Sequence, residues 1–192
     1  MYSQAKFIDS SIDEYLQFDL ESIVRHEYIA GQVYPVLKDS HNLKVIAENL
    51  FARLRTQLYG SDCQVFTSDM KIRIEPINAF YYPEVSVVRD SEDKELYFKT
   101  RPCLIAEVIS PITERIDRNE KLFNYRQLPS LQEYILIHQS EMKVELYRKF
   151  YQNNWFMQTL TQDNILQLQS VDVEITMAEI YEDVELGKII NH

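Results

Sequence analysis

The sequence predicts an α/β fold in which helices flank a central mixed β-sheet. Helical spacing of apolar residues before residue 60 gives way to two-residue alternation after it. Residues 103–109 are almost entirely apolar, as in a strand buried on both faces. The expected elements run in the order helix, strands, helix, strands, which favours helices packed on a sheet. The length of 192 residues suits one compact domain, so we expect residues 1–192 to form a single domain.

The N-terminal part of the chain is expected to hold two helices with a hairpin between them. The first helix is short and begins at Ser10 or Ser11, both of which are good capping residues. Residues 26–36 have the pattern of a hairpin that turns at Ala30-Gly31. A longer helix is predicted over residues 41–59, because one apolar stripe recurs there at helical spacing. The stripe consists of Leu43, Ile46, Ala47, Leu50, Leu54 and Leu58.

Strands are predicted in the middle and at the end of the chain. Residues 66–74 alternate between apolar and polar side chains, and residues 81–88 form a second strand. The charged stretch 89–101 is expected to be a loop that leads into the central strand 103–109. The later elements are expected to be a helix over 113–128, a strand over 133–138, a hairpin of 142–150 with 155–160, a strand over 171–175 and a helix over 177–186.

The net charge of −10 argues against attraction of nucleic acid by the overall field of the protein. A nucleic-acid-binding protein of this composition therefore needs a local basic patch or a bound metal ion. The best candidate patch comprises Arg53, Arg55, Lys71 and Arg73. These residues alternate with apolar ones, so a solvated helix and strand face is the default interpretation.

Cysteine usage and hydropathy predict a cytoplasmic protein with no membrane partner. Cys63 and Cys103 lack zinc-binding spacing, and Cys103 lies in an apolar run that predicts a buried thiol. No leader sequence opens the chain, and no run approaches the ~18 apolar residues of a membrane span. The 13 Tyr and 9 Phe predict an aromatic-rich core or interface, and on that basis we expect a homodimer.

Glu107 is the leading candidate for a functional residue. It lies within the apolar run 103–109, where a lone buried carboxylate is costly unless it is paired or bound to a cation. Glu84, in the preceding predicted strand, is its natural partner. Two carboxylates on adjacent strands can bind one Mg²⁺ or Mn²⁺, and the carbonyl of Val108 is a candidate third ligand. The alternative is that Glu84 is a solvent-facing strand residue.

Lys121 is the candidate cationic residue on the helix that follows. Asp117, Lys121 and Tyr125 are spaced four residues apart and so share one helical face. The simpler interpretation is an ion pair between residues i and i+4 on a solvated helix. The functional interpretation turns Lys121 toward the carboxylates, where it could orient water or stabilise charge on a phosphate.

A series of short motifs resembles the core signature of the Uma-two family, a bacterial group of restriction-endonuclease-like proteins. The resemblance covers about residues 25–150. The matching residues are Pro83-Glu84-Val85, Glu107-Val108-Ile109-Ser110-Pro111, Asp117, Lys121, Tyr125 and Glu133-Tyr134, with weaker matches at Glu27, Gly31 and His41.

The resemblance implies a PD-(D/E)XK nuclease fold with an acidic pair and a lysine at a metal site. In the parent pattern the lysine falls two residues after the second acid, but Ile109 occupies that position here. The family places the lysine on the helix, which selects Lys121. The family's Asp is Glu84 in this chain, and the additional methylene displaces the carboxylate at a site where Mg²⁺ geometry is strict.

Two classes of function follow from these residues. The first is a metal-dependent endonuclease that hydrolyses DNA, in which Glu84 and Glu107 hold the metal and Lys121 assists the attacking water. Glu27 and His41 are auxiliary candidates for the same site. The second is a catalytically degenerate protein that acts as a dimeric binding or regulatory module. The replacement of Asp by Glu84 and the net charge of −10 both favour the second class.

Overall fold

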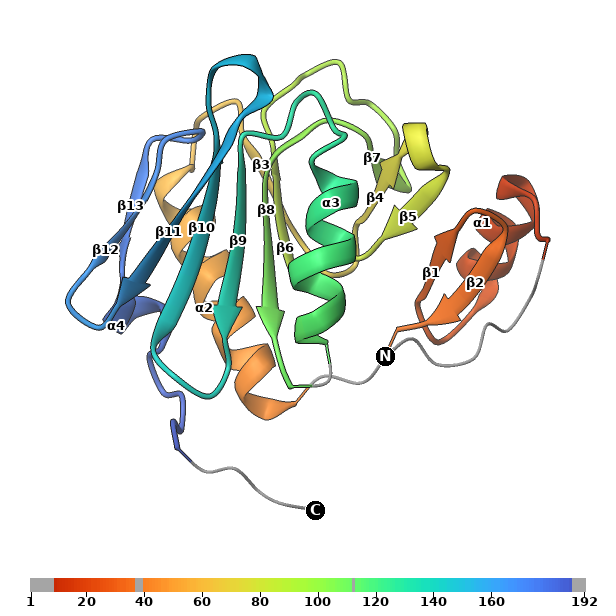
Figure 1. The fold of residues 1–192 in the computed structure, drawn as a ribbon. Helices are drawn as coiled ribbons and strands as arrows, with labels where there is room; N and C mark the ends of the chain where they lie inside the picture. Colours follow the sequence, from red (N-terminus) through yellow and green to blue (C-terminus); the bar gives the residue numbers. More distant parts are fainter. Residues whose placement is uncertain (1–8, 37–39, 112, 188–192) are drawn as a thin grey trace.

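The computed structural model describes residues 9–36, 40–111 and 113–187 and contains two larger β-sheets and a two-stranded ribbon (Figure 1). In the six-stranded sheet, β8 and β9 are parallel and the other neighbours are antiparallel, as expected of a mixed sheet. Its strands are, in spatial order, β11 (Trp155–Thr161), β10 (Lys143–Lys149), β9 (Glu133–His138), β8 (Pro102–Ile109), β6 (Val85–Val88) and β3 (Gln64–Thr67).

The five-stranded sheet contains the N-terminal hairpin. Ala30 and Gly31, at the hairpin turn, both have positive φ (47° and 94°), as in a type I′ turn, which confirms the predicted turn position. The strands of this sheet are, in order, β2 (Gln32–Pro35), β1 (His26–Ile29), β5 (Ala79–Tyr81), β4 (Lys71–Ile74) and β7 (Phe98–Lys99). The ribbon pairs β12 (Ile165–Leu168) with β13 (Val173–Thr176).

Helices cover both faces of the six-stranded sheet (Figure 1). Helix α2 (His41–Gln57), capped by the Ser40 hydroxyl, packs on one face together with the ribbon and α4 (Met177–Ile180). On the other face, a π-helical segment, η2 (Ile116–Lys121), continues into α3 (Leu122–Tyr125). The remaining helices are α1 (Ile12–Glu21), with the Ser11 cap, and the short η1 (Glu75–Ile77) and η3 (Tyr151–Asn153). No helix in the described residues is long and apolar enough to cross a membrane.

Strand β8 is buried along its whole length, as the sequence predicted. Its alternate side chains enter two different cores. Leu104, Ala106 and Val108 face α2, whereas Ile105 and Ile109 face the layer that contains α3. Glu107 alternates with the second set, so its carboxylate lies on the α3 face of the sheet.

Several predicted boundaries are wrong, and the chain chemistry explains the most important one. The predicted strand 66–74 is divided into β3 and β4, and the predicted strand 81–88 into β5 and β6, so that each pair is distributed over both larger sheets. Pro83 has no backbone N–H to continue a ladder, and the break falls at Pro83 and Glu84. The predicted loop 89–101 includes β7, and the ribbon strand β12 was not foreseen.

Candidate active site

The ammonium group of Lys121 lies among the carboxylates of Glu27, Glu107 and Asp117, and Glu84 adds a fourth acid at the edge of this acidic cluster. Lys121 Nζ is 3.1 Å from Glu27 Oε1, 3.1 Å from Glu107 Oε1 and 3.5 Å from Asp117 Oδ1. These three carboxylates come from β1, β8 and η2, so the cluster joins both larger sheets through the helix between them. The three acids and the lysine are all buried.

Glu84 faces the same side of the six-stranded sheet as Glu107. In the antiparallel ladder between β6 and β8, Ser86 pairs with Ile105. Because side chains alternate along a strand, Glu84 shares the face of Ser86, and Glu107 shares the face of Ile105. The charge of Glu84 contributes to raising the pKa of Glu107, so the two carboxylates interact. Glu84 is half-buried in the bend before β6, at the edge of the cluster.

The carbonyl of Val108 points toward the β6 side of strand β8. Backbone groups of Cys103 and Ile109 establish the direction, because their carbonyls accept hydrogen bonds from the Gln132 and Gln139 amides on the β9 side. Carbonyls alternate between the two sides along a strand, so that of Val108 points the opposite way. The ladder with β6 begins only at Ala106, opposite Val85, and therefore does not extend to Val108.

The π-helical segment η2 places Asp117 and Lys121 within the cluster. The amide of Leu122 donates to the carbonyl of Asp117, five residues back, which gives a wider turn than an α-helix has. Such π-helical turns are rare and occur often at functional sites. The sequence predicted that Asp117, Lys121 and Tyr125 share a face, and all three contact the cluster.

Tyrosines enclose the cluster and donate hydrogen bonds to it. The hydroxyl of Tyr125 lies 3.2 Å from Glu107 Oε1, and that of Tyr134 lies 3.0 Å from the carbonyl of Asp117. Burial raises the pKa of both phenols well above the ordinary value, so they remain protonated donors. The ring of Tyr81 lies 5.6 Å from Lys121 Nζ, as in a cation–π contact.

The cluster contains more negative than positive groups. Burial raises the pKa of Glu107 well above its usual value; Lys121 opposes the shift, and Asp117, Glu84 and Glu27 increase it. Burial also raises the pKa of Glu27. Burial alone would lower the pKa of Lys121, but the attraction of Glu107, Glu27 and Asp117 raises it, so the ammonium stays charged. One ammonium cannot neutralise four carboxylates, and the surplus charge favours binding of a proton or another cation.

The chemistry of this donor set suits a hard divalent cation. All four acids offer oxygen ligands, as does the Val108 carbonyl, and Mg²⁺ and Mn²⁺ prefer oxygen. Within the described residues, no three Asp, Glu, His or Cys side chains have the arrangement of a metal centre. The Lys121 ammonium instead lies between the acids. The residues therefore fit a metal in charge and donor type.

A second buried carboxylate network holds η2 against β10. Glu145 accepts hydrogen bonds from Arg118 and from Tyr147 (3.0 Å), and its Oε1 is 3.2 Å from His138 Nε2. Burial alone would raise the pKa of Glu145, but these hydrogen bonds lower it, so the group is ionised. Sequence reasoning missed this network because its members belong to three elements that become neighbours only in the folded sheet.

The predicted site residues differ in how the structure places them. Lys121 directly contacts both Glu107 and the auxiliary candidate Glu27. Glu84 lies at the edge of the cluster. His41 is exposed at the start of α2, the helix on the opposite face, and takes part in none of the cluster contacts described above. Asp117 was named for its spacing with Lys121, but its place beside Glu107 and Glu27 was not foreseen.

Comparison with known proteins identifies relatives along most of the chain. The protein slr1290 of Synechocystis sp., described as uncharacterized, is 35% identical over 178 residues, which are 92% of this chain and 94% of that protein. A second uncharacterized Synechocystis protein, sll1609, is 33% identical over 154 residues, covering 79% of this chain and 87% of its own.

A solved structure shares the fold. It is described as a "putative nuclease belonging to DUF820" from Anabaena variabilis and superposes with a TM-score of 0.73 over 90% of this chain and 97% of that chain, at 14% identity. The shared fold confirms the predicted α/β architecture of a mixed sheet flanked by helices. The family model Uma2, described as "Putative restriction endonuclease", matches residues 12–178. This chain therefore belongs to the Uma2 family.

Proposed function

We propose that this protein is a metal-dependent endonuclease that hydrolyses phosphodiester bonds in DNA. The observation that carries the proposal is the buried acidic cluster around Lys121 on the α3 face of the sheet, where the charge of Glu84 acts on Glu107. Membership of the Uma2 family supports a nuclease-like activity. The metal, the DNA substrate and the residue roles are our inference from the geometry.

Glu84, Glu107 and the Val108 carbonyl would hold the metal, which we take to be Mg²⁺ or Mn²⁺. When bound, such a metal polarises a phosphodiester and lowers the pKa of a coordinated water. Its positive charge would also offset the surplus negative charge of the cluster. This role accounts for a half-buried Glu84 at the cluster edge, where solvent and substrate have access.

The other residues of the cluster would orient the acids and stabilise charge. The Tyr125 hydroxyl and the Lys121 ammonium both hold Glu107 Oε1, which restricts the rotamers of that carboxylate. A charged lysine in a water-poor site stabilises negative charge on a phosphate more strongly than a lysine in bulk solvent. Lys121 can also orient the attacking water.

A nicking assay on supercoiled plasmid tests the proposal. We expect the native protein to nick the plasmid with Mg²⁺ or Mn²⁺, and Glu107→Gln to abolish nicking. Asp19→Asn is a matched control, because Asp19 is also buried and pairs with a buried lysine, Lys71, at 2.6 Å outside the cluster. Absence of nicking by the native protein, or full activity of Glu107→Gln, would contradict the proposal.

The degenerate, non-catalytic module remains the second candidate, because the Lys121 ammonium fills the middle of the cluster and Glu84 stands in place of the family's Asp. Glu84→Asp separates the two candidates. If Glu84→Asp nicks plasmid faster than the native protein, the chain is a nuclease whose activity is reduced by the additional methylene of Glu84. Inactivity of both proteins with metal would favour the binding or regulatory module.

A further inference from the structure

Arg126 lies at the end of α3 remote from η2, with its guanidinium over two aromatic rings. Its Cζ is 5.7 Å from the centroid of Tyr147 and 5.2 Å from that of Trp155. Tyr147 and Trp155 belong to β10 and β11, and the strand registers place both rings on the same sheet face as Glu107. Tyr125, Tyr134 and Tyr147 form a continuous row of ring contacts from the acidic cluster to this arginine.

The guanidinium of Arg126 has no anionic partner among the described residues. Its Nε is buried without a hydrogen-bond partner there, and the side chain as a whole is half-buried. Burial lowers the pKa of Arg126, with no carboxylate to oppose the shift. Six other arginines form ion pairs, namely Arg25, Arg53, Arg73, Arg101, Arg118 and Arg148, whereas Arg55, Arg89 and Arg115 are exposed to solvent. A half-buried cation without a counter-ion is costly, and an external anion would offset that cost.

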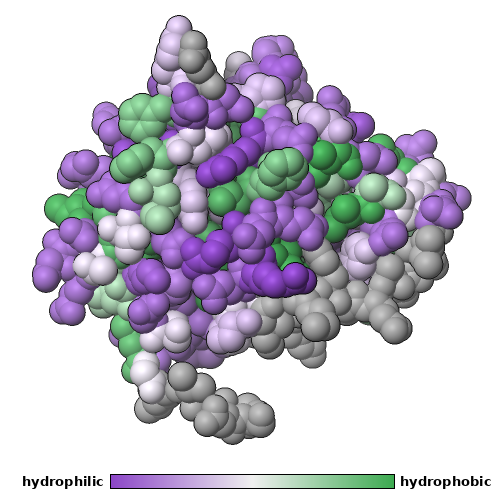
Figure 2. All heavy atoms as spheres, viewed as in Figure 1, coloured by the Kyte–Doolittle hydropathy of each residue, from purple (hydrophilic) through white to green (hydrophobic). Residues whose placement is uncertain are grey.

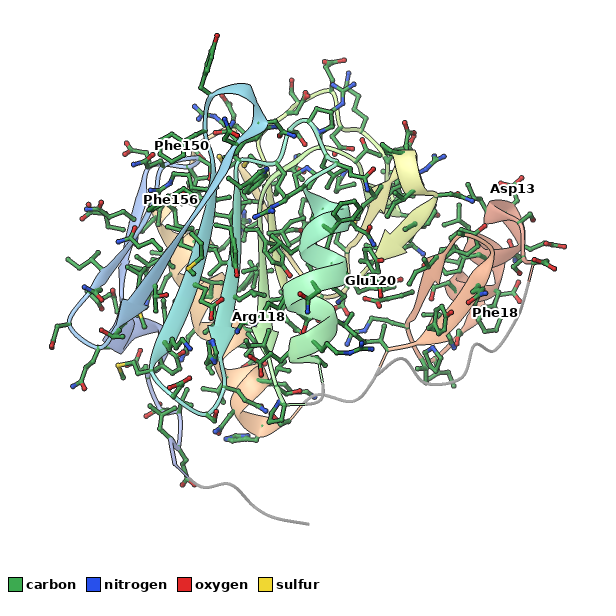
Figure 3. The ribbon with its side chains drawn as sticks, in the orientation of Figure 1. Asp13, Phe18, Arg118, Glu120, Phe150 and Phe156 are labelled. Carbon is green, nitrogen blue, oxygen red and sulfur yellow. The ribbon has the colours of Figure 1, made fainter. Side chains whose placement is uncertain are left out.

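Lys149 supplies a second cation beside the same indole. It lies directly opposite Trp155 in the β10–β11 ladder, and its Nζ donates to the carbonyl of Pro129 at 3.0 Å. It makes no ion pair with the described carboxylates. Phe150 and Phe156, whose exposed rings contact each other (Figure 3), lie apart from this face, because Phe156 alternates with Trp155 along β11. Figure 2 shows that hydrophilic side chains cover most of the face that carries α3, with apolar ones in small groups. On a chain with a net charge of −10, Arg126, Lys149 and the Trp155 ring form a local cationic and aromatic patch.

We propose that Arg126 and Lys149 bind backbone phosphates of the nucleic acid that reaches the acidic cluster, an inference that rests on the proposed nuclease function. A planar guanidinium already stacked on rings presents two N–H donors to phosphate oxygens with little further loss of entropy. Arg126 is separated from the cluster by the ring contacts Tyr125–Tyr134 (5.6 Å) and Tyr134–Tyr147 (6.2 Å) and by the Tyr147–guanidinium contact (5.7 Å). One strand several nucleotides long can therefore contact the arginine while another of its phosphodiesters lies at the cluster.

The candidate patch named from the sequence is less suitable for this role. Lys71 is buried against Asp19, and Arg53 pairs with Glu179 and Glu182 on the α2 side of the molecule. Arg53→Met is therefore the matched control for Arg126→Met. Both changes remove one guanidinium and retain an unbranched side chain.

The test is binding of a fluorescein-labelled duplex DNA in EDTA, where cleavage cannot occur, at several salt concentrations. We expect Arg126→Met and Lys149→Met each to weaken binding about tenfold and to reduce the slope of log K against log salt by about 0.9. Arg126→Lys should retain the slope while losing part of the affinity, because the charge remains and the fork is lost. Arg53→Met should bind as the native protein does. Thermal melts of each variant report whether the fold is intact.

The outcomes separate this inference from the proposed function. If Arg126→Met and Lys149→Met bind DNA as tightly as the native protein, with the same salt slope, Arg126 is only a cation–π contact between helix and sheet and the inference fails. Nicking by the native protein would still stand in that case. If binding depends on Arg126 and no protein nicks plasmid, the phosphate site stands and the catalytic proposal fails. If the native protein binds no DNA at low salt, the inference is overturned.

Discussion

Replacement of Lys121 by Met tests whether the ammonium neutralises the acidic cluster. The change keeps an unbranched side chain and removes the cation that lies 3.1 Å from both Glu27 and Glu107. Removal of one partner from a buried ion pair costs about 3–5 kcal/mol, because the remaining charge is left uncompensated. For a chain of this size, about 2–4 °C in Tm per kcal/mol gives an expected loss of roughly 6–20 °C.

The pH dependence of this loss gives a second, independent measurement. Lys121 opposes the rise in the pKa of Glu107, so the variant should have a still higher pKa at that carboxyl. A carboxyl with a raised folded pKa binds more protons in the native state than in the unfolded state. Stability therefore increases as the pH falls through the folded pKa toward the unfolded value near 4.5. The Tm of Lys121→Met should accordingly move closer to that of the native protein as the pH is lowered from 8 to 5.

Lys71→Met is the matched control. Lys71 is buried and pairs with the single buried carboxylate of Asp19, outside the proposed metal site. Both variants should have a lower Tm than the native protein. Only Lys121→Met should regain stability with Mn²⁺, because the metal replaces the lost positive charge. Calorimetry at pH 5, 7 and 8, with and without Mn²⁺, measures all three effects. An unchanged Tm in Lys121→Met, or equal rescue of both variants by Mn²⁺, would refute the reasoning.

Three further predictions concern the metal, the acid at position 84 and the assembly. Mn²⁺ should raise the Tm of the native protein but not that of Glu107→Ala; identical responses would exclude a shared cation site. Glu84→Asp should bind Mn²⁺ and cleave plasmid faster than the native protein, as measured by nicking rates; slower cleavage would show that Glu84 already has the effective geometry. Light scattering at micromolar concentration should report a homodimer, and a mass of only 22.9 kDa would contradict that expectation.

The central part of the fold was predictable because local patterns determine it. The apolar run around Glu107 can be satisfied only by a strand covered on both faces, and β8 is such a strand. Asp117, Lys121 and Tyr125 share a helical face by spacing alone, and that face meets Glu107. The fold of these segments follows from periodicity, which requires no knowledge of distant contacts.

The division into two sheets could not be predicted from periodicity. In residues 66–74 the polar run Thr67-Ser68-Asp69 interrupts the alternation at the turn that separates β3 from β4, and it was a usable sign of the break. Pro83 was a usable signal, because a proline interrupts a ladder. Glu27 joins the cluster only because β1 pairs with β5 through Tyr28 and Phe80, a long-range register that no local pattern encodes.

The position of the lysine follows from how the two layers meet. Ile109 occupies the parent lysine position and is buried on the α3 face, two residues beyond Glu107. There it packs in the same core as Leu122, where a charged side chain would have to be buried among apolar ones. Lys121 instead extends from η2, in the helical layer that covers the sheet, and reaches the cluster from above the strand. It then contacts acids from β1, β8 and its own helix at once. One side chain thus connects both larger sheets and the helix, so that the geometry of Glu107 depends on the docking of η2.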